Sequence, residues 1–585
     1  MTSALHSTRV ITPTGVIEAT LILADGKIQD VLPGRVEQEG ISFESFGDKV
    51  IMPGVIDAHV HINEPGRTEW EGFETATKAA AAGGITTLIE MPLNASPVTT
   101  TVEALKLKHE AARGKLHVNV GFYGGVILNN IDDLGGLLNA GVFGIKAFLT
   151  HSGIDEFPNV TEADLRKALP ILKKHDAKLL VHCELESPST VTLSPSKRNS
   201  RSYAEYLASR PAKWETDAIA LMIRLSEEFD VHVHIVHVSA AEALPLIRDA
   251  KRRGLRITAE TCPHYLVFCA EEIPDGATEF KCAPPIRERA NNELLWEALK
   301  DGTLDFVATD HSPAPPEMKE TQSGDFMKAW GGIAGLQFLL PAFWTGAKVK
   351  GFSLEDVARL LCTNPADFLG LREKGRIAPG CDADLVVWDP EKSFVVKVED
   401  IQHRHRLTPY AGRTLHGKVE RTFVNGRTMR HGQADGCVLF GLAPVGKEQE
   451  FMDRIDCCLP YNDQDGMKRL INEAWAISAN ASYAVLEEVC RLPVEQRAVV
   501  TRQRQLELLD MLETSFEHPF KKQLFEVARR MVADQLLSVK ETKDLMLRLK
   551  QYHGQWAALN VLYFAYGADA SEIEDLDAEI RASWR

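Results

Sequence analysis

The feature that most constrains this chain is a regular alternation of short apolar runs with amphipathic stretches between Ile51 and about residue 370. Runs such as LLVHCE and VHVHIVHVS have the length of strands, and they alternate with helix-like segments such as EALKLKHEAARG and DLRKALPILKKH. Such alternation favours a parallel α/β domain, because parallel strands need a crossover between them. The length of the segment fits a (β/α)₈ TIM-type barrel, which we assign to residues 51–374.

Strand-like sequence flanks this segment on both sides. The first fifty residues alternate apolar runs with turn signals, as in RVITPTG, ATLILADGKI and DKVIMPG. Turn-rich strands return in RIAPGCDADLVVWDP and VERTFVNGRTMRHG. We therefore expect residues 1–50 and 375–440 to form one composite β-domain that flanks the barrel.

Residues 446–585 differ from the rest of the chain, because long periodic stretches such as FKKQLFEVARRMVADQLL predict amphipathic helices. Ser538-Val-Lys-Glu541 and Ser571-Glu-Ile-Glu574 fit helix-capping boxes, and Gly567 fits a helix stop. This segment predicts a separate all-α domain and carries no chemical motif. Self-association, docking of another protein and regulation remain open as its role.

Composition excludes several classes of partner. The formal net charge is −16, from 66 basic and 82 acidic residues, whereas nucleic-acid binding needs a concentrated basic surface. No apolar run approaches the roughly 18 residues of a membrane helix, and the N-terminus lacks the pattern of a secretory signal. The ten cysteines include no C-x-x-C pair, and only Cys457 and Cys458 are adjacent. We expect a cytoplasmic protein without a disulfide framework.

The strongest chemical signal is Asp57-Ala-His59-Val-His61, directly after the apolar run VIMPGVI. Two histidines at i and i+2 on a strand project from the same face, so both imidazoles can reach one metal ion. The motif lies at the carboxyl end of the expected first barrel strand, which is the end where barrel active sites lie.

Further candidate ligands lie at later strand ends. His182 ends LLVHCE, His237 ends VHVHIVHVS, and Asp310 follows the apolar run DFVATDHS. Imidazoles with a carboxylate suit a borderline or hard divalent metal. His232 and His234 lie at odd spacing from His237, so on a regular strand they would point to the opposite face, and we interpret them as structural.

Lys146 lies inside the apolar run GVFGIKAFL, where a bare ammonium group would be costly to bury. The side chain could extend from a strand end into water. Alternatively, burial favours the neutral amine, which can react with CO₂ to form an anionic carbamate that bridges two metals. Charge balance favours the carbamate, because two dications require more negative charge than Asp310 supplies.

These residues stand in a dense series of motifs. DAHVHINEPGRTEWEGFETATKAAAAGGITTLIEMPLN, GIKAFL, LLVHCE, HVS, TCPHYL, KCAPPIR, TDHSPAPPEMK and AWGGIAGLQFLLP follow one another along the chain. Their order resembles that of the cyclic amidohydrolases of the amidohydrolase superfamily, which include dihydroorotases, hydantoinases and allantoinases. The resemblance covers about residues 1–440. It implies a metal-bearing barrel with a flanking composite β-domain.

The resemblance also implies a site with two divalent metals, with zinc as the default. One metal would be held by His59, His61 and Asp310. The other would be held by His182 and His237, with carbamylated Lys146 bridging the two. A metal-bridging hydroxide would attack the ring carbonyl, and Asp310 would carry the proton to the departing nitrogen.

The choice of substrate within the group depends on fewer residues. The first-strand motif is similar to the allantoinase version, and Asn63 occupies the position where dihydroorotases carry an arginine for the substrate carboxylate. Allantoin offers neutral ureide groups, for which an amide is the better partner. His151 and Ser152 follow the lysine strand, and Ala283 matches a position that contacts ring amides through its backbone. Asn63 could instead cap a turn, and His151 could merely line its loop.

The sequence therefore predicts hydrolytic ring opening of allantoin to allantoate. The alternatives are a hydantoinase or dihydropyrimidinase acting on another ring, and a non-catalytic scaffold that acts through protein contacts. The expected partners are a small-molecule substrate and further copies of the chain as a dimer or tetramer. A protein partner at residues 446–585 is also possible on this reading, whereas nucleic acid and membrane are not expected.

Overall fold

The computed structural model describes residues 2–186, 199–428, 436–439 and 441. The predicted helical segment 446–585 lies outside these residues. The chain divides into two units, and the described secondary structure lies almost wholly in the unit formed by Met1–Leu138 and Val142–Gly441. Among the described residues, none of the helices combines the length and apolar character needed to cross a bilayer.

Strands and helices alternate along most of this unit. The strands are β1 (Ser3–Thr12), β2 (Gly15–Ala24), β3 (Lys27–Pro33), β4 (Ser42–Ser45), β5 (Val50–Pro53), β6 (Val55–Val60), β7 (Ile85–Glu90), β8 (Asn119–Phe122), β9 (Gly124–Gly125), β10 (Ile145–Phe148), β11 (Lys178–His182), β12 (His232–Ile235), β13 (Ile257–Thr261), β14 (Phe306–Val307), β15 (Leu385–Val395), β16 (Thr414–Val424) and β17 (Arg427–Thr428). The helices are α1 (Phe73–Ala82), α2 (Val102–Ala112), α3 (Leu134–Asn139), α4 (Glu162–Lys174), α5 (Tyr203–Ser209), α6 (Ala212–Phe229), α7 (Leu244–Arg252), α8 (Pro263–Val267), α9 (Arg289–Lys300), α10 (Leu339–Val349), α11 (Leu354–Ala358) and α12 (Asn364–Leu369).

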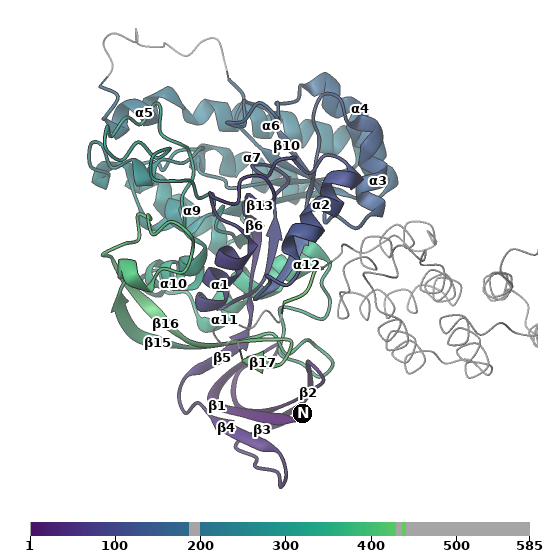
Figure 1. Ribbon diagram of the computed structural model, residues 1–585, viewed down its shortest axis with the longest axis vertical. Coiled ribbons are helices and arrows are strands. Elements are labelled where there is room, and N and C mark those ends of the chain that lie inside the picture. Colours follow the sequence, from purple (N-terminus) through teal and green to yellow (C-terminus); the bar gives the residue numbers. More distant parts are fainter. Residues whose placement is uncertain (1, 187–198, 429–435, 440, 442–585) are drawn as a thin grey trace, which may run out of the picture. The chain divides into compact units, whose positions relative to one another are not determined.

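The strands from β6 to β14 pair only in parallel. One sheet has the order β14-β13-β12-β11-β10-β9, and the other has the order β6-β7-β8. β8 and β9 are separated by a single residue, and a parallel bridge joins Val60 at the end of β6 to His311, after β14. Figure 1 shows these strands in the interior with helices such as α4 and α6 outside them. The mixed α/β content predicted from the sequence is confirmed.

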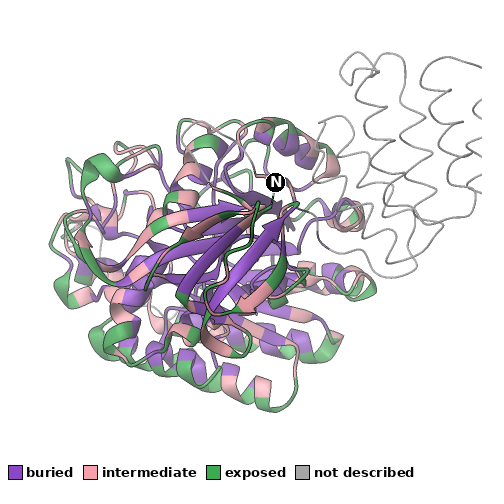
Figure 2. Ribbon diagram, turned by 90° about the horizontal axis from the view of Figure 1, so that it is seen from below, coloured by how far each residue is buried: buried purple, intermediate pink, exposed green. Residues whose placement is uncertain are grey.

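Local sequence explains where the helices begin. The side chain of Thr161 accepts a hydrogen bond from the Asp164 amide, and the Asp164 carboxylate accepts one from the Thr161 amide, so a complete capping box starts α4. Buried leucines and alanines lie along one side of this helix, namely Leu165, Ala168, Leu169 and Leu172. Figure 2 shows the resulting pattern, in which the strands are buried and the outer helix faces are exposed.

The two ends of the described unit share one mixed sheet. Its order is β17-β16-β15-β5-β1-β2-β3, with β4 paired to β1. β5 lies between β1, to which it is parallel, and β15, to which it is antiparallel. Apolar side chains from both ends of this sheet, including Ile51, Leu385 and Phe423, belong to one core cluster with Val10 and Leu21. The strands predicted before and after the α/β segment therefore join each other.

Candidate metal centre

Five of the six predicted metal ligands lie at or just beyond the carboxyl ends of the parallel strands, and the sixth, Lys146, lies within its strand. His59 is the next-to-last residue of β6, and His61 follows that strand directly. Lys146 is in β10, and His182 is the last residue of β11. The two remaining residues, His237 and Asp310, lie just beyond β12 and β14. All six are buried. Neighbouring strands thus bring side chains from distant parts of the sequence to one edge.

His59, His61 and Asp310 form a compact group of metal-ligand type, whose ligand atoms lie within 4.8 Å of one another. The Nε2 atoms of His59 and His61 lie 3.3 Å and 3.4 Å from Oδ1 of Asp310. Burial lowers the pKa of His61 to about 4, which keeps its imidazole neutral near pH 7. Although burial opposes it, the neighbouring histidines hold the pKa of Asp310 below its ordinary value. Neutral imidazoles and an ionised carboxylate are the forms that bind metals.

The remaining histidines continue the cluster. The ring centroid of His237 lies 5.4 Å from that of His59 and 4.6 Å from that of His182. Phe148 stacks on His182 at 4.6 Å and closes that side of the group. Burial lowers the pKa values of both His182 and His237. These two rings are therefore also neutral and close enough to serve a second ion beside the first.

Lys146 is the most unusual group in the centre. Its side chain is fully buried, and its Nζ has no hydrogen-bond partner among the described residues. Its Nζ lies over the ring of Phe148, 4.9 Å from the ring centroid. Burial lowers the pKa of Lys146 to about 8. A buried, unpaired amine with this pKa is partly neutral at physiological pH, as the sequence interpretation requires.

Two buried glutamates orient the histidines, and the sequence interpretation missed both. Oε1 of Glu260 lies 2.5 Å from Nδ1 of His59, and Oε2 of Glu184 lies 2.7 Å from Nε2 of His182. The partner histidines lower the pKa of Glu260 to about 2 despite burial, and Arg210 with His182 does the same for Glu184. Each glutamate fixes one ring nitrogen and leaves the other for a metal. Glu184 stands two residues after His182, a spacing that could have indicated it.

His234 corrects one step of the sequence interpretation. It does not lie on the face opposite to His237, because its Nε2 is 3.1 Å from Oε2 of Glu260, the residue that also contacts His59. β12 ends at Ile235, and His237 has a left-handed backbone with φ of 39°, so strand alternation does not extend to it. His234 also contacts Thr258 through Nδ1, which leaves neither ring nitrogen for a metal. His232 contacts the same threonine.

Asn63 is buried beside the ligand cluster with one half of its amide unused. Its Nδ2 donates to the carbonyl of Pro313 at 3.3 Å, and its Oδ1 has no partner among the described residues. Asn63 has a φ of 68°, a left-handed conformation that asparagine tolerates better than most residues. Asn94, which the sequence interpretation passed over, also has an unpartnered Oδ1 and places its Nδ2 3.5 Å from Nδ1 of His61. Two buried asparagines near the ligand cluster therefore each have an acceptor oxygen without a partner among the described residues.

The other predicted substrate residues lie on nearby loops. His151 is exposed, and its ring contacts Asp155 and the Gly153 amide. The hydroxyl of Ser152 donates to two carbonyls of its own loop, those of Ile154 and Phe157. Ala283 is half-buried near Gly331, where an added Cβ would lie 3.9 Å from the Ala283 amide nitrogen. The structure brings Asn63 against the metal ligands and leaves the His151 ring at the loop surface.

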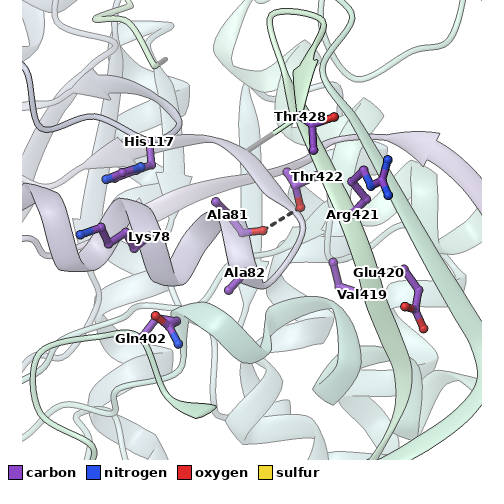
Figure 3. A pocket seen from close by; sticks show the side chains of 10 residues that line it. All are labelled: Lys78, Ala81, Ala82, His117, Gln402, Val419, Glu420, Arg421, Thr422 and Thr428. Carbon is purple, nitrogen blue, oxygen red and sulfur yellow. Dashed lines mark hydrogen bonds between the residues drawn. The ribbon is translucent and has the colours of Figure 1, made fainter. Parts of the chain in front are cut away.

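A separate pocket of about 300 Å³ lies away from this centre (Figure 3). It is lined by Lys78, Ala81, Ala82, His117, Gln402, Val419, Glu420, Arg421, Thr422 and Thr428. α1 ends beside it and leads into β7, and His117 precedes β8, so it lies at the amino ends of the parallel strands. The metal-ligand cluster is at their carboxyl ends, and the pocket therefore belongs to the other side of the fold.

Comparisons with known proteins show which family the chain is similar to. The profile described as "Amidohydrolase family" matches residues 50–429. Allantoinase from Streptomyces avermitilis is 50% identical over 433 residues, covering 74% of this chain and 95% of the relative. Allantoinase from Arabidopsis thaliana is 45% identical over 439 residues, covering 72% and 87%. The structure of L-hydantoinase (dihydropyrimidinase) from Arthrobacter aurescens matches with a TM-score of 0.71 at 29% identity, covering 75% of this chain and 100% of that one.

Proposed function

The chain belongs to the amidohydrolase family, and from this premise we propose that it hydrolyses allantoin to allantoate. The observation that carries the proposal is the sequence identity to an allantoinase, which is 50% over 95% of that relative's length. The identity to a hydantoinase of known structure is 29%. The reaction adds water across one amide C–N bond of the hydantoin ring. The carbon becomes a carboxylate, and the nitrogen leaves with the proton.

The donor set supports a centre with two divalent metals. His59, His61 and Asp310 would hold one ion, and His182 and His237 the other, with a carbamylated Lys146 as the bridge. Support comes from the close ligand group and from the buried Nζ of Lys146, which has no partner among the described residues. Nitrogen and oxygen ligands of this kind suit zinc. When bound, such ions lower the pKa of water and polarise a carbonyl.

The residues of the chain supply proton transfer and orientation. Asp310 accepts a proton from the attacking water and returns it to the ring nitrogen as the C–N bond breaks. The Oδ1 of Asn63 accepts a hydrogen bond from an N–H of the substrate, because its Nδ2 is already committed to Pro313. Ala283 and Ser152 contribute through the main chain of their loops, since the Ser152 hydroxyl is occupied locally. His151 lies at the rim, where it can contact the outer part of the substrate.

The architecture proposed for this activity is a closed (β/α)₈ barrel over residues 51–374. The Val60–His311 bridge and the near-continuous β8 and β9 support closure of the two parallel sheets. The mixed sheet at residues 1–50 and 375–440 would form the flanking composite β-domain, and 446–585 an all-α domain for self-association or for a protein partner. Deletion of 446–585, with turnover and mass in solution as readouts, separates these roles. If both readouts are unchanged, an external partner is favoured.

A substrate comparison tests the activity. Turnover of allantoin should exceed that of hydantoin, dihydrouracil and dihydroorotate under the same conditions. Preference for any of the other three rings would contradict the assignment and favour the hydantoinase alternative. Metal analysis of the purified protein tests the scaffold alternative, because fewer than about one ion per chain is incompatible with a two-metal hydrolase.

We further propose a cytoplasmic homo-oligomer, a dimer or a tetramer, that acts on its small-molecule substrate without nucleic acid or membrane. Mass measurement of the full chain in solution tests the oligomeric state. A monomer at working concentration would contradict it. Fractionation of the source cells tests the compartment.

A further inference from the structure

Two buried lysines near the metal centre donate only to main-chain carbonyls among the described residues. The Nζ of Lys319 lies 3.1 Å from the carbonyl oxygen of Lys281, 2.9 Å from that of Trp330 and 2.8 Å from that of Gly332. The Nζ of Lys281 lies 3.3 Å from the carbonyl of Met327 and 2.5 Å from that of Ala329. Both residues are at most 9% exposed. Burial of an ammonium group is costly, and the hydrogen bonds to these carbonyls offset that cost for each lysine.

The bonds of the two lysines are reciprocal between two loops. Lys281 begins the loop 281–287 that precedes α9, and it donates to the loop 313–335 that follows β14. Lys319 belongs to the loop 313–335, and it donates back to the carbonyl of Lys281. The amide of Gly332 adds a main-chain bond to the same carbonyl, at 2.9 Å. We call Lys281 and Lys319 the lysine clasp.

The loop 281–287 is a fixed support for this clasp. Four side-chain hydroxyls from other segments donate to its carbonyls, namely Tyr206 to Cys282, Tyr265 to Pro284, Ser239 to Pro285 and Tyr203 to Ile286. The ring of Tyr206 also lies under the Lys281 ammonium group, with 5.2 Å between Nζ and the ring centroid. A loop held by so many side chains can hold a second loop in place.

The loop 313–335 contacts every segment that carries a proposed substrate residue. The carbonyl of Pro313 accepts from Asn63. The ring of Trp330 packs on Gly153, where an added Cβ would lie 3.3 Å from Cζ3, and Trp330 meets Trp70 edge-on at 4.8 Å. Gly331 lies beside Ala283. A shift of the stretch 327–332, to which both lysines donate, would therefore move the walls of the substrate site, whereas Ile333 beside it is paired with His311.

We propose that the lysine clasp positions the loop 313–335 as the wall of the substrate pocket. The clasp therefore acts on substrate binding and not on the metals. This inference rests on the proposed allantoin hydrolysis for its kinetic readout only. Lysine is suited to the task because its three N–H donors can satisfy three carbonyls that no carboxylate could serve.

The test compares Lys319→Met, Lys281→Met and the double variant with the wild-type holoenzyme. Lys300→Met is the matched control, because Lys300 also donates to a carbonyl, that of Lys350, but on the exposed surface between α9 and the end of α10. The measurements are kcat and KM for allantoin, bound metal per chain, and amide hydrogen exchange in peptides that cover 313–335. The Gly332 amide, which donates to Lys281, reports directly on the joined loops.

For Lys319→Met we expect KM to rise about tenfold or more, with kcat changed less than about threefold and with full metal content. Exchange in 313–335 should accelerate, while exchange in α10 stays as in the wild type. The double variant should add little to the single ones, because both lysines serve one joint. Should Lys319→Met not yield folded protein, Lys281→Met, which removes fewer bonds, decides alone.

The clasp is refuted if KM and loop exchange in the lysine variants match those of Lys300→Met. It is equally refuted if metal is lost in proportion to activity. If the wild type does not turn over allantoin, the proposed function fails, whereas the exchange comparison still decides whether the clasp holds the loop.

Discussion

The two halves of the ligand cluster are prepared to different degrees by the protein. The ligand atoms of His59, His61 and Asp310 already lie within 4.8 Å of one another. In the other half, the Nζ of Lys146 and the Nδ1 of His237 are buried without a hydrogen-bond partner among the described residues. The first half can be built from unmodified side chains. The second contains a buried amine, which under the proposed carbamylation would gain an acidic group and a metal ion.

This difference indicates where the proposed centre needs a group that unmodified side chains do not provide, namely a bridging anion. A bridging anion between two dications would require a carboxylate at the tip of a long, unbranched side chain, and carbamylation of lysine gives that length. The two halves should therefore lose their metal under different conditions. In the proposed centre, the first half depends on geometry alone, and the second half would also depend on dissolved CO₂.

The largest expected effect is that of Lys146→Ala. Loss of the bridge should reduce kcat by at least about a thousandfold and lower bound metal from about two ions per chain to about one or fewer. Added short carboxylic acids should restore part of both, because the cavity left by the side chain can hold a free carboxylate. Lys300→Ala serves as the control. Full metal content and activity in Lys146→Ala would contradict the bridging role.

Changes of the two orienting glutamates should have intermediate effects. Glu260→Gln and Glu184→Gln keep the shape of each side chain but remove the charge that polarises His59 and His182. Each should weaken metal binding about 10–100-fold, as measured by competition with a chelator. Because the glutamates serve different halves, each single variant should loosen one ion and the double variant both. Loosening of the same ion by both variants would mean that the halves are not separate.

A smaller effect is expected at Asn63, which contacts substrate in this scheme and not metal. Asn63→Gly removes the amide while keeping the left-handed backbone with φ of 68° free of strain. We expect KM for allantoin to rise about tenfold, as for one lost hydrogen bond, with unchanged metal content. Asn63→Ala controls for the backbone, since it should lose stability as well. An unchanged KM in the glycine variant would assign Asn63 to the loop alone.

A last effect, on folding stability and not on catalysis, concerns a buried histidine outside both halves, which gives a reference for acid sensitivity. Burial lowers the pKa of His109 to about 3 from 6.5. Between pH 6.5 and 3, His109 is therefore protonated in the unfolded chain but not in the folded chain. The free energy of unfolding falls as the pH falls through this window. The contribution is at most about 1.4 kcal/mol per pH unit. His109→Phe should flatten the stability curve there by that slope in denaturant titrations, and an equally steep curve would assign the acid sensitivity to other groups.

Ligands within regular strands could be predicted from the sequence better than ligands that lie beyond the strand ends. His59 lies within β6 and His182 ends β11, so their positions at strand ends could be predicted from apolar runs alone. His237 and Asp310 lie beyond their strands in left-handed conformations, with φ of 39° and 46°. Their sequence position suggested them, but alternation could not predict where they point, and it placed His234 on the wrong face.

The roles of the two glutamates and of the loop 313–335 could not be predicted from the sequence for another reason. A buried acid inside a strand, such as Glu260 in β13, is explained only by partners that are distant in sequence. The parallel sheets and the helices α2 and α4 follow from local periodicity and capping. By contrast, the loop 313–335 is held by carbonyl acceptors, and every residue has a carbonyl, so its sequence carries no signal of that contact.

The position of β5 has a consequence for how the chain is made. β5 ends at Pro53, and the strand that covers its second edge, β15, begins only at Leu385. At about 5–20 residues per second, a ribosome takes on the order of half a minute to synthesise the residues between them. Throughout that time the amino-terminal strands present an open edge next to the nascent α/β segment. Early binding of a chaperone to these strands would protect the protein at the step where it is most exposed to aggregation.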